Sequence, residues 1–307
     1  MGETMSRGDT TIAIVAYNAK NHIKPLFESI KKQTVKPREV LVVVDFPEDN
    51  TIPIAKMYGF RTIVSDKPKI YGCRNTALRE CKSKIISFTD SDCVIVDDFV
   101  ENVERVFREV STAAITGPHP RVNPKKNIWN WIHENRFRVQ AKKTGYTDGV
   151  IGANSSFSVT LLKMVGGWPD IPNIMAAEDV AISNRLQENH FKVWFDESVV
   201  VNHHYKSSLG ALVKQEIVMG SDIMTMMLHE GRRGYLFWYS IGIPLFFGMA
   251  VYLALTDWLS LALLLGASFA YMCIVSGGIR KAFPQWVARI ICLPFYSYGI
   301  LKGLIRI

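Results

Sequence analysis

In the first third of the chain, apolar runs typical of strands alternate with segments whose apolar residues have helical spacing. Apolar runs of the kind found in strands buried on both faces of a parallel sheet occur at 10–18, 38–45, 61–66 and 84–92. Between them, apolar residues recur at helical spacing, so that Ile23, Leu26, Phe27 and Ile30 share one face. We expect helices at 22–34, 50–59 and 72–81. Strands and helices in alternation predict an α/β domain with a parallel sheet.

The predicted strands end in acidic residues. Asp45, Asp66, Asp90 and Asp92 each lie at the carboxyl end of an apolar run. Ligands in open α/β sheets bind beyond the carboxyl ends of the strands. The pattern therefore predicts an acidic rim along one edge of the sheet, and a binding site at that rim.

The end of the chain has a different pattern. From Tyr235 to Gly278 the only charged residue is Asp257, and apolar segments of membrane-spanning length lie at 235–256 and 258–276. A third segment, 283–305, contains Arg289, Pro294 and Lys302, and is read either as a span or as an interfacial helix. We expect a soluble domain at 1–232 and an all-α transmembrane domain at 233–307. The competing interpretation is a buried helical hairpin in a soluble protein.

Charge and cysteine content indicate where the domain resides. The chain has 307 residues, a net charge of +8, and five cysteines without metal-ligand spacing, which we read as free thiols in a reducing compartment. The first ten residues are polar, without a signal peptide, and Arg280 and Lys281 favour the cytosolic side. We expect a multi-pass integral protein of the cell membrane whose catalytic domain faces the cytosol.

Some function classes are disfavoured by missing motifs. No G-x-G-x-x-G follows the first strand and no G-x-x-x-x-G-K-[ST] occurs, which argues against dinucleotide oxidoreductases and P-loop NTPases. The basic residues are spread over several helices, and the membrane anchor accounts for their excess, so no nucleic-acid partner is predicted. The sequence indicates no oligomeric state.

Asp90 and Asp92 stand one residue apart in "FTDSDCV". Two carboxylates at that spacing repel unless a cation lies between them. Oxygen ligands at a strand end suit Mg²⁺ or Mn²⁺, which could neutralise a diphosphate leaving group. The simpler interpretation is a solvated acidic turn.

Two later stretches carry polar groups of catalytic type. Glu178 and Asp179 open a predicted helix, where they either cap the helix or supply a general base. In the strand that follows, Val201, His203 and Tyr205 share one face and His204 faces the other way. One histidine can therefore face a site.

Taken in order, these motifs resemble a known family. The series "TIAIVAYN", "VLVVVD", "GCRN", "FTDSD", "GANSSF", "GGW", "AEDVAISNRL" and "VVNHHYKSSL" is similar to inverting family 2 glycosyltransferases of the GT-A fold, over about residues 10 to 220. The added apolar helices resemble the cellulose-synthase-like and polyprenyl-phosphate sugar transferase branches. The resemblance implies a Rossmann-like domain that binds a nucleoside-diphosphate sugar.

The resemblance also implies roles for single residues near the donor. The nucleotide pocket would be formed by Ala16, Tyr17, Asn18, Asp45 and Arg74. Asp92 would be the main ligand of Mn²⁺ or Mg²⁺, with Asp90 sharing the metal or contacting the sugar or ribose, and His203 as a third contact.

Further roles follow for the reacting groups and the acceptor. Asp179 would be the catalytic base, with Glu178 beside it on the acceptor side. Gly152 and Asn154 would lie under the donor sugar or acceptor, and Trp168 would line the acceptor side.

Two motifs depart from the family pattern. The usual D-D-G-S after the second strand reads "DFPEDN" here, so that Asp49 takes the place of the second aspartate. The Q-x-x-R-W motif of processive synthases is missing, and the corresponding helix offers Lys214 on the acceptor side but no Trp. The missing Q-x-x-R-W motif favours transfer of a single sugar.

The expected activity is transfer of one sugar, with mannose from GDP-mannose as first choice, to a polyprenyl or dolichyl phosphate or a lipid-linked glycan at the lipid bilayer. Residues 125–146 mix aromatic and basic side chains and form either an interfacial segment or an ordinary surface helix. The alternatives are a short-polymer polysaccharide synthase, a nucleotidyltransferase, whose Gly-rich opening is absent, and a catalytically inactive membrane scaffold.

Overall fold

The computed structural model describes residues 8–45, 48–67, 69–122, 125–137, 143–171, 174–231, 235–276 and 278–305, without the side chains of 137, 235–237 and 239. Two compact units make up the chain. The first comprises Met1–Val122, Ala141–Asp170 and Glu178–His204, and the second comprises Asn123–Gln140, Ile171–Ala177 and Tyr205–Ile307. Each unit is described by itself.

An eight-stranded sheet forms the centre of the first unit, in the order β3-β2-β1-β4-β8-β6-β9-β7. Its strands are β1 (Thr10–Ala16), β2 (Glu39–Val44), β3 (Arg61–Val64), β4 (Ile85–Asp90), β6 (Ala114–Thr116), β7 (Gly145–Thr147), β8 (Ser155–Ser158) and β9 (Val193–Phe195). The strands β3, β2, β1 and β4 are parallel, as predicted, and β8 runs antiparallel to β4. A separate antiparallel pair joins β5 (Cys93–Ile95) to β10 (Val201–His203).

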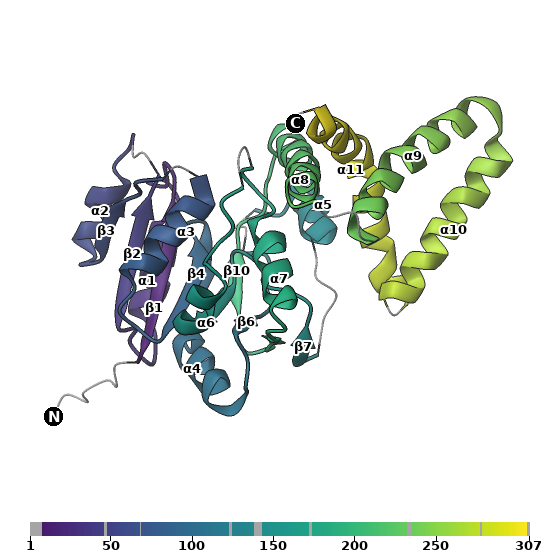
Figure 1. The fold of residues 1–307 in the computed structure, drawn as a ribbon. Helices are drawn as coiled ribbons and strands as arrows, with labels where there is room; N and C mark the ends of the chain where they lie inside the picture. Colours follow the sequence, from purple (N-terminus) through teal and green to yellow (C-terminus); the bar gives the residue numbers. More distant parts are fainter. Residues whose placement is uncertain are drawn as a thin grey trace. The chain divides into compact units, whose positions relative to one another are not determined.

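Helices connect these strands and cover the sheet (Figure 1). They are α1 (Lys24–Lys31), α2 (Thr51–Met57), α3 (Lys69–Glu80), α4 (Phe99–Glu109), α6 (Val159–Met164) and α7 (Glu178–Glu188). The predicted inner face of α1 is buried with the apolar side chains of β1 and β2, in a core that also contains β5 and α4. This core holds β1, β2 and β4 in register, so their carboxyl ends meet at one edge.

The second unit is helical. It contains α5 (Ile128–Phe137), α8 (Leu209–His229), α9 (Tyr235–Thr256), α10 (Trp258–Ser276) and α11 (Ile279–Ile305). Helices α8 and α11 run in the same direction at very short separation, because glycines remove side chains from their contact. A Cβ at Gly303 would lie 2.5 Å from the carbonyl oxygen of Ser221, and one at Gly220 would lie 2.5 Å from that of Tyr296.

Helix α8 groups with the C-terminal helices in this compact unit, together with α5 and Ile171–Ala177. The division into a soluble domain at 1–232 and a transmembrane domain at 233–307 stays a prediction. The third apolar segment, placed at 283–305, is the continuous helix α11, which begins at Ile279. Part of α11 is therefore covered by protein, which explains why its sequence is less uniformly apolar than its neighbours.

Residues 125–137, expected in an interfacial segment, include α5 and pack within this unit. Trp129 and Trp131 lie against a cluster containing Leu212 and Cys292, from α8 and α11. The Nε atom of Arg136 lies 3.3 Å from a carboxylate oxygen of Glu216, which is fully buried. These contacts favour a structural helix over a membrane-surface helix; residues 138–142 of the expected segment lie outside the described residues.

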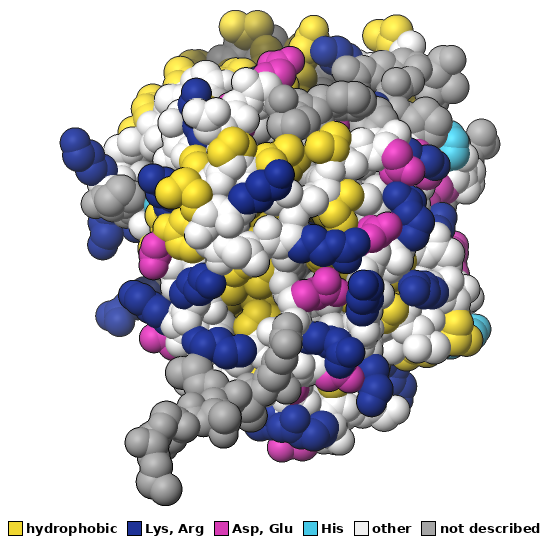
Figure 2. Space-filling model, turned by 90° about the vertical axis from the view of Figure 1, so that its left-hand side faces the viewer, with side chains coloured by type: hydrophobic (Ala, Val, Ile, Leu, Met, Phe, Trp, Pro, Cys, Tyr) yellow, Lys and Arg dark blue, Asp and Glu magenta, His cyan; other side chains and the backbone are white. Residues whose placement is uncertain are grey.

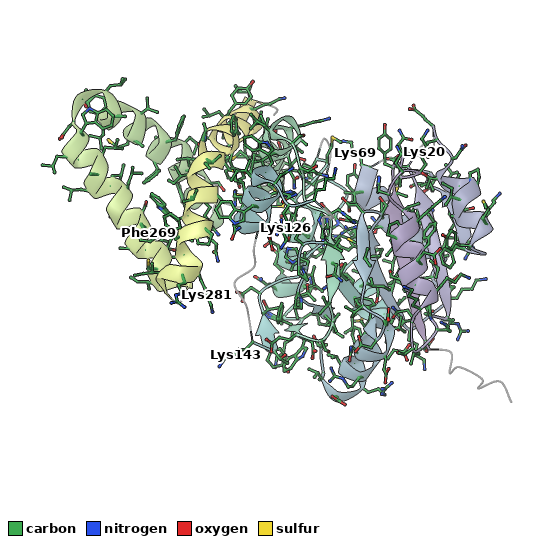
Figure 3. All side chains as sticks on the ribbon, turned by 180° about the vertical axis from the view of Figure 1, so that it is seen from behind. Lys20, Lys69, Lys126, Lys143, Phe269 and Lys281 are labelled. Atoms are coloured by element: carbon green, nitrogen blue, oxygen red, sulfur yellow. The ribbon has the colours of Figure 1, made fainter. Side chains whose placement is uncertain are left out.

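Helices α9 and α10 form an apolar hairpin whose turn is Asp257. The Oδ1 atom of Asp257 accepts hydrogen bonds from the backbone N–H groups of Leu259 and Ser260, which caps α10. Among the described residues, α10 and α11 are long and apolar enough to cross a membrane, and Ser240–Thr256 forms a shorter apolar stretch. Phe269 projects from α10 towards Phe283 and Trp286 of α11 (Figure 3).

Most large side chains on the hairpin are nevertheless exposed. Trp258, Leu259 and Leu263 are examples from α10, and Leu255 ends α9 with 81% of its surface exposed. Contiguous apolar surface on helices of this length is typical of contact with lipid.

Charged side chains on the exposed surface are mixed in sign. On the face drawn in Figure 2, Lys and Arg alternate with Asp and Glu over the described residues, without one continuous cationic stripe. Such mixing is ordinary for a soluble domain surface and does not resemble the basic stripe of a nucleic-acid-binding face. All five cysteines are free, as expected.

Candidate functional site

Asp90 and Asp92 lie at the carboxyl end of β4, next to the short β5–β10 pair. In this pair His203 stands opposite Cys93, which brings its ring beside Asp92. The His203 Nε2 atom lies 3.5 Å from the Asp92 Oδ1 atom, and both side chains are partly exposed. The predicted third metal contact is thus brought to the main metal carboxylate by strand pairing.

These residues offer ligand atoms for a metal ion. Ligand atoms of Asp92, Cys93 and His203 all lie within 4.8 Å of one another. Burial, together with the charges of Asp90 and Asp92, raises the pKa of the Cys93 thiol well above its usual value. The Asp92 carboxylate is a ligand of the kind that suits Mn²⁺ or Mg²⁺, and the His203 imidazole adds a nitrogen donor beside it.

Asp90 turns away from this pair towards Arg74 of α3. The Arg74 Nη2 atom lies 3.4 Å from the Asp90 Oδ1 atom and 3.3 Å from the Glu178 Oε1 atom. Arg74 is 1% exposed, and its guanidinium lies 4.3 Å from the centre of the Trp168 ring. One buried arginine therefore neutralises carboxylates from both acidic motifs.

The burial of Arg74 and Trp168 changes the roles expected for them. Arg74 is buried and forms ion pairs with Asp90 and Glu178. Direct contact between Arg74 and a nucleotide stays a prediction. Trp168 is 1% exposed and packs against Phe88 and Phe157, so it supports the arginine from the core. This position does not favour direct contact between Trp168 and an acceptor.

Glu178 and Asp179 begin α7 as predicted, but they occupy different surroundings. Burial raises the pKa of Glu178 to about 7, although Arg74 acts in the opposite direction. Asp179 is half-buried, and its Oδ2 and Oδ1 atoms accept hydrogen bonds from the backbone N–H groups of Gly152 and Val180. Asp179 is thus the more accessible carboxylate, and its orientation is set by backbone donors.

Gly152 lies where the two acidic motifs meet. A Cβ at this position would lie 3.0 Å from the Glu178 Oε1 atom and 3.1 Å from the Arg74 Nη2 atom. Only hydrogen fits there without moving the ion pair, so Gly152 serves the site through its small size.

Asn154, predicted beside the donor or acceptor, is fully buried. Its Nδ2 atom donates to the carbonyl oxygens of Pro118 and Val199, at 3.1 and 2.8 Å. Asn154 therefore joins two loops through its side-chain amide, and its contact with a donor or acceptor stays a prediction.

The predicted nucleotide pocket lies around the ends of β1 and β2. Asp45 accepts a hydrogen bond from the backbone N–H of Lys69 at 2.9 Å, and its own N–H donates to the carbonyl oxygen of Ala16. Tyr17 is 61% exposed, and Asn18 has a left-handed φ of +47° that turns the chain back. Lys20 and Lys69 lie at this same end of the sheet (Figure 3).

Asp49 holds the start of α2. Its Oδ2 atom accepts from the backbone N–H of Lys20, and its Oδ1 atom accepts from both the backbone N–H and the hydroxyl of Thr51. Burial raises the pKa of Asp49, but the hydrogen bonds from Thr51 and Lys20 together outweigh it and lower the pKa. Both oxygens are engaged locally, and a contact between Asp49 and a nucleotide stays a prediction.

Two neighbours of the site were not predicted. His119 lies next to His203, and burial, then the charge of His203, lowers the pKa of His119 to about 4. Phe88 also packs beside Arg74, 5.8 Å from its guanidinium and in edge-to-face contact with Trp168. Neither residue carries a recognisable motif, because each is defined only by what the fold places beside it. Lys214 is an exposed residue of α8 in the second unit, and its acceptor contact stays a prediction.

Solved structures with this architecture are glycosyltransferases. Mannosyltransferase PcManGT from Pyrobaculum calidifontis, in complex with GDP-Man and Mn²⁺, superposes with a TM-score of 0.56 at 16% identity, over 98% of this chain and 87% of that chain. Residues 1–349 of S. aureus TarS superpose with a TM-score of 0.54 at 15% identity, over 96% and 91%. These likenesses confirm the predicted α/β fold of the GT-A type.

Related sequences carry similar names. The O-antigen chain rhamnosyltransferase RfbN of Salmonella typhimurium (strain LT2) is 24% identical over 209 residues, which span 64% of this chain and 66% of the relative. The Escherichia coli UDP-Glc:alpha-D-GlcNAc-diphosphoundecaprenol beta-1,3-glucosyltransferase WfaP is 33% identical over 96 residues, or 30% of this chain and 38% of the relative. The match thus spans just under two thirds of the RfbN chain.

The sequence also matches a defined family over its N-terminal half. Residues 11–166 match the profile described as Glycosyl transferase family 2. This match confirms the resemblance read from the motifs and the enzyme class that it implies, whereas the membrane-bound branch stays a prediction. The chain belongs to glycosyl transferase family 2.

Proposed function

We propose that this chain is a membrane-bound inverting glycosyltransferase that moves one sugar from a nucleoside-diphosphate sugar to a lipid-borne acceptor. The observation that carries the proposal is the convergence of Asp90, Arg74 and Glu178 in one ion network, with the Asp92–His203 pair and Asp179 beside it. The chemistry of such a site is transfer at an anomeric carbon, with a metal on the departing diphosphate.

The residues present fit a divalent ion. Asp92 and His203 would hold Mn²⁺ or Mg²⁺, with Asp90 close enough in sequence to share it or to contact the sugar. When bound, the ion supplies positive charge for the diphosphate leaving group. Arg74 forms an ion pair with Asp90 and keeps its carboxylate oriented. Its positive charge also reduces the repulsion between Asp90 and Asp92, so no second cation from solvent is needed.

Asp179 is the residue best suited to receive the proton of an acceptor hydroxyl. Its carboxylate is oriented by two backbone donors and is more accessible than Glu178. Attack from the face opposite the diphosphate inverts the anomeric configuration in one displacement, as in inverting glycosidases. With a lipid phosphate as acceptor the nucleophile is already ionised, and Asp179 then acts mainly in positioning.

Exposed apolar helices support a lipid-borne acceptor. An acceptor such as a polyprenyl or dolichyl phosphate, or a glycan attached to one, resides in the bilayer, and the α9–α10 hairpin offers the apolar surface that a bilayer would cover. We propose a multi-pass arrangement with the site on the cytosolic side. The missing Q-x-x-R-W motif supports transfer of one sugar instead of a polymer.

For the donor we propose mannose as the first sugar to test. Support comes from the fold of a mannosyltransferase solved with GDP-Man, while relatives named as rhamnosyl- and glucosyltransferases make dTDP- and UDP-sugars the next choices.

The test is donor turnover by the full chain in nanodiscs with Mn²⁺ or Mg²⁺. GDP-, UDP- and dTDP-sugars are supplied with polyprenyl phosphate or with a lipid-linked saccharide, and both nucleoside diphosphate and glycolipid are measured. We expect one donor to be consumed, with loss of turnover in excess chelator and in the Asp179→Asn variant when the acceptor is a hydroxyl. Failure to consume any donor with either acceptor would overturn the proposal.

A further inference from the structure

The chain enters α7 through a turn that is held by a buried carboxylate of another helix. Asp222 lies in α8 and is 1% exposed. Its Oδ2 atom accepts hydrogen bonds from the backbone N–H groups of Met175 and Ala176, at 2.6 and 2.9 Å. Ala177 follows, and the next residue is Glu178, the first residue of α7. The proposed catalytic pair therefore begins two residues after the held backbone.

This turn has a backbone conformation that needs support. Ala177 has φ = +66°, in the left-handed region that residues other than glycine avoid. Its side chain is 1% exposed, and Ile174, at the start of the turn, is fully buried. Strained backbone persists where surrounding contacts hold it, and two charge-assisted hydrogen bonds to the Asp222 carboxylate hold this turn.

Asp222 itself is fixed by close helix packing. In the sequence of α8, Asp222 follows Ser221 and precedes Met224, and both of these residues contact Gly303 of α11. A Cβ atom on Gly303 would lie 2.5 Å from the Ser221 carbonyl oxygen and 2.9 Å from the Met224 Cβ. Helices packed at such short separation cannot slide without a clash. The carboxylate is therefore presented from a rigid pair of helices.

We propose that Asp222 is a positioning residue for the catalytic carboxylates, acting through the turn 174–177 without touching substrate. This inference rests on the proposed function, in which Asp179 is the base. If the turn relaxes, the first turn of α7 shifts with it, and the Asp179 carboxylate loses its alignment with the acceptor. A displacement of about 1 Å in a reacting group can lower turnover by about 100-fold.

The pattern of kinetic effects distinguishes positioning from general destabilisation. Donor binding uses residues at the ends of β1, β2 and β4, which lie elsewhere in the sequence. We therefore expect Asp222→Ala to lower kcat by about 100-fold while the KM for the donor changes less than about threefold. Asp222→Asn keeps an amide oxygen that can accept both N–H groups, so it should restore kcat to within about tenfold of wild type.

Ser221→Ala is the matched control, because Ser221 is equally buried and adjacent but makes no contact with residues 174–177 in the hydrogen bonds described. Thermal unfolding of all variants and hydrogen exchange at the amides of Met175 and Ala176 accompany the kinetics. We expect faster exchange of these amides in Asp222→Ala than in Ser221→Ala. If Asp222→Ala does not fold, the same exchange and kinetic measurements on Asp222→Asn and Asp222→Ser test the positioning role. We then expect a larger loss of kcat in Asp222→Ser than in Asp222→Asn.

The outcomes separate this inference from the proposed function. If wild type consumes no donor, the proposed function fails, and the exchange data alone test the hold on the turn. If wild type is active and Asp179→Asn is impaired, but Asp222→Ala and Ser221→Ala have the same kcat and the same amide exchange, the positioning role of Asp222 is overturned. Equal losses in kcat and donor affinity would also overturn it.

Discussion

Arg74 and Glu178 form a buried ion pair that joins the two acidic motifs of the chain. The Nη2 atom of Arg74 lies 3.3 Å from the Oε1 atom of Glu178, and their side chains are 1% and 8% exposed. The same nitrogen atom reaches Asp90, so a cation supplied by α3 balances carboxylates that follow β4 and begin α7. The carboxylate pair Asp90–Asp92 is thus stabilised by a protein cation on one side, with room for a metal at Asp92.

Replacing Arg74 should destabilise the fold strongly. Arg74→Ala leaves the buried Glu178 and the partly exposed Asp90 without their partner, and we expect a loss of about 3–5 kcal/mol in the free energy of unfolding, measured by urea denaturation of the catalytic unit in the full chain. Arg79→Ala is the control, because Arg79 lies on the same helix but pairs with Asp66 at the exposed surface. A double variant with Glu178→Gln should recover part of the loss. Equal stability of the Arg74 and Arg79 variants would contradict this assignment.

The stability of the fold should depend on Glu178 as pH changes. Its pKa is raised, by burial first, from 4.5 to about 7, so the folded protein binds a proton between these values that the unfolded chain has released. Stability therefore falls as pH rises from about 4.5 to about 7, by up to about 3 kcal/mol from this group, and levels off above pH 7.

Comparison with Glu178→Gln isolates this effect. The difference in unfolding free energy between wild type and the variant, followed in metal-free buffer from pH 5 to pH 8, should change in the direction that disfavours wild type at the higher pH. A difference that stays constant over this range would show that Glu178 titrates as an ordinary surface carboxylate.

Asp179→Asn should reveal the nature of the acceptor. If the acceptor is a sugar hydroxyl, loss of the general base lowers kcat by about 100- to 10,000-fold, because the hydroxyl proton loses the carboxylate that we propose receives it. If the acceptor is a lipid phosphate, the loss should be less than about tenfold. Steady-state turnover with each acceptor measures the difference, and an unchanged KM for the donor is the control that donor binding is intact.

Metal affinity should depend on His203 and not on His204. His203→Ala removes the imidazole 3.5 Å from Asp92, and we expect Mn²⁺ binding to weaken by about 10-fold or more, measured by calorimetric titration in the presence of nucleoside diphosphate. His204→Ala keeps the backbone N–H that donates to the Asp92 carbonyl oxygen, and should bind Mn²⁺ like wild type. The ligand assignment is wrong if the two variants lose affinity equally.

Local patterns along the chain were sufficient to predict much of the fold. The apolar runs of β1, β2, β3 and β4 and the buried face of α1 are local features, and their alternation identified a parallel sheet. The carboxyl ends of parallel strands must meet at one edge, so Asp45, Asp90 and Asp92 could be assigned to a common rim. The start of α7 at Glu178 and the apolar helices α9 and α10 followed from equally local patterns.

The roles of several buried side chains could not be predicted from local sequence patterns. Asn154 and Trp168 belong to motifs that resemble those of the family, yet both side chains are buried. Asn154 donates hydrogen bonds to two loops, and Trp168 packs on Arg74. Both carboxylate oxygens of Asp49 likewise accept hydrogen bonds from nearby backbone N–H groups and from the Thr51 hydroxyl. Whether a polar side chain faces solvent or a neighbour depends on elements distant in sequence.

By itself, the sequence determined the first four strands, the helices between them, the acidic rim and the apolar C-terminal region, because each depends on residue spacing within a few turns or strands. The tertiary structure alone decided that Arg74 joins Asp90 to Glu178, that His203 stands at Asp92, and that Asp222 holds the turn before α7. These contacts join residues from about 16 to more than 100 positions apart. Local patterns carry no information about such pairs, since only packing of the whole core decides which side chains are brought together and which charges are buried with a partner.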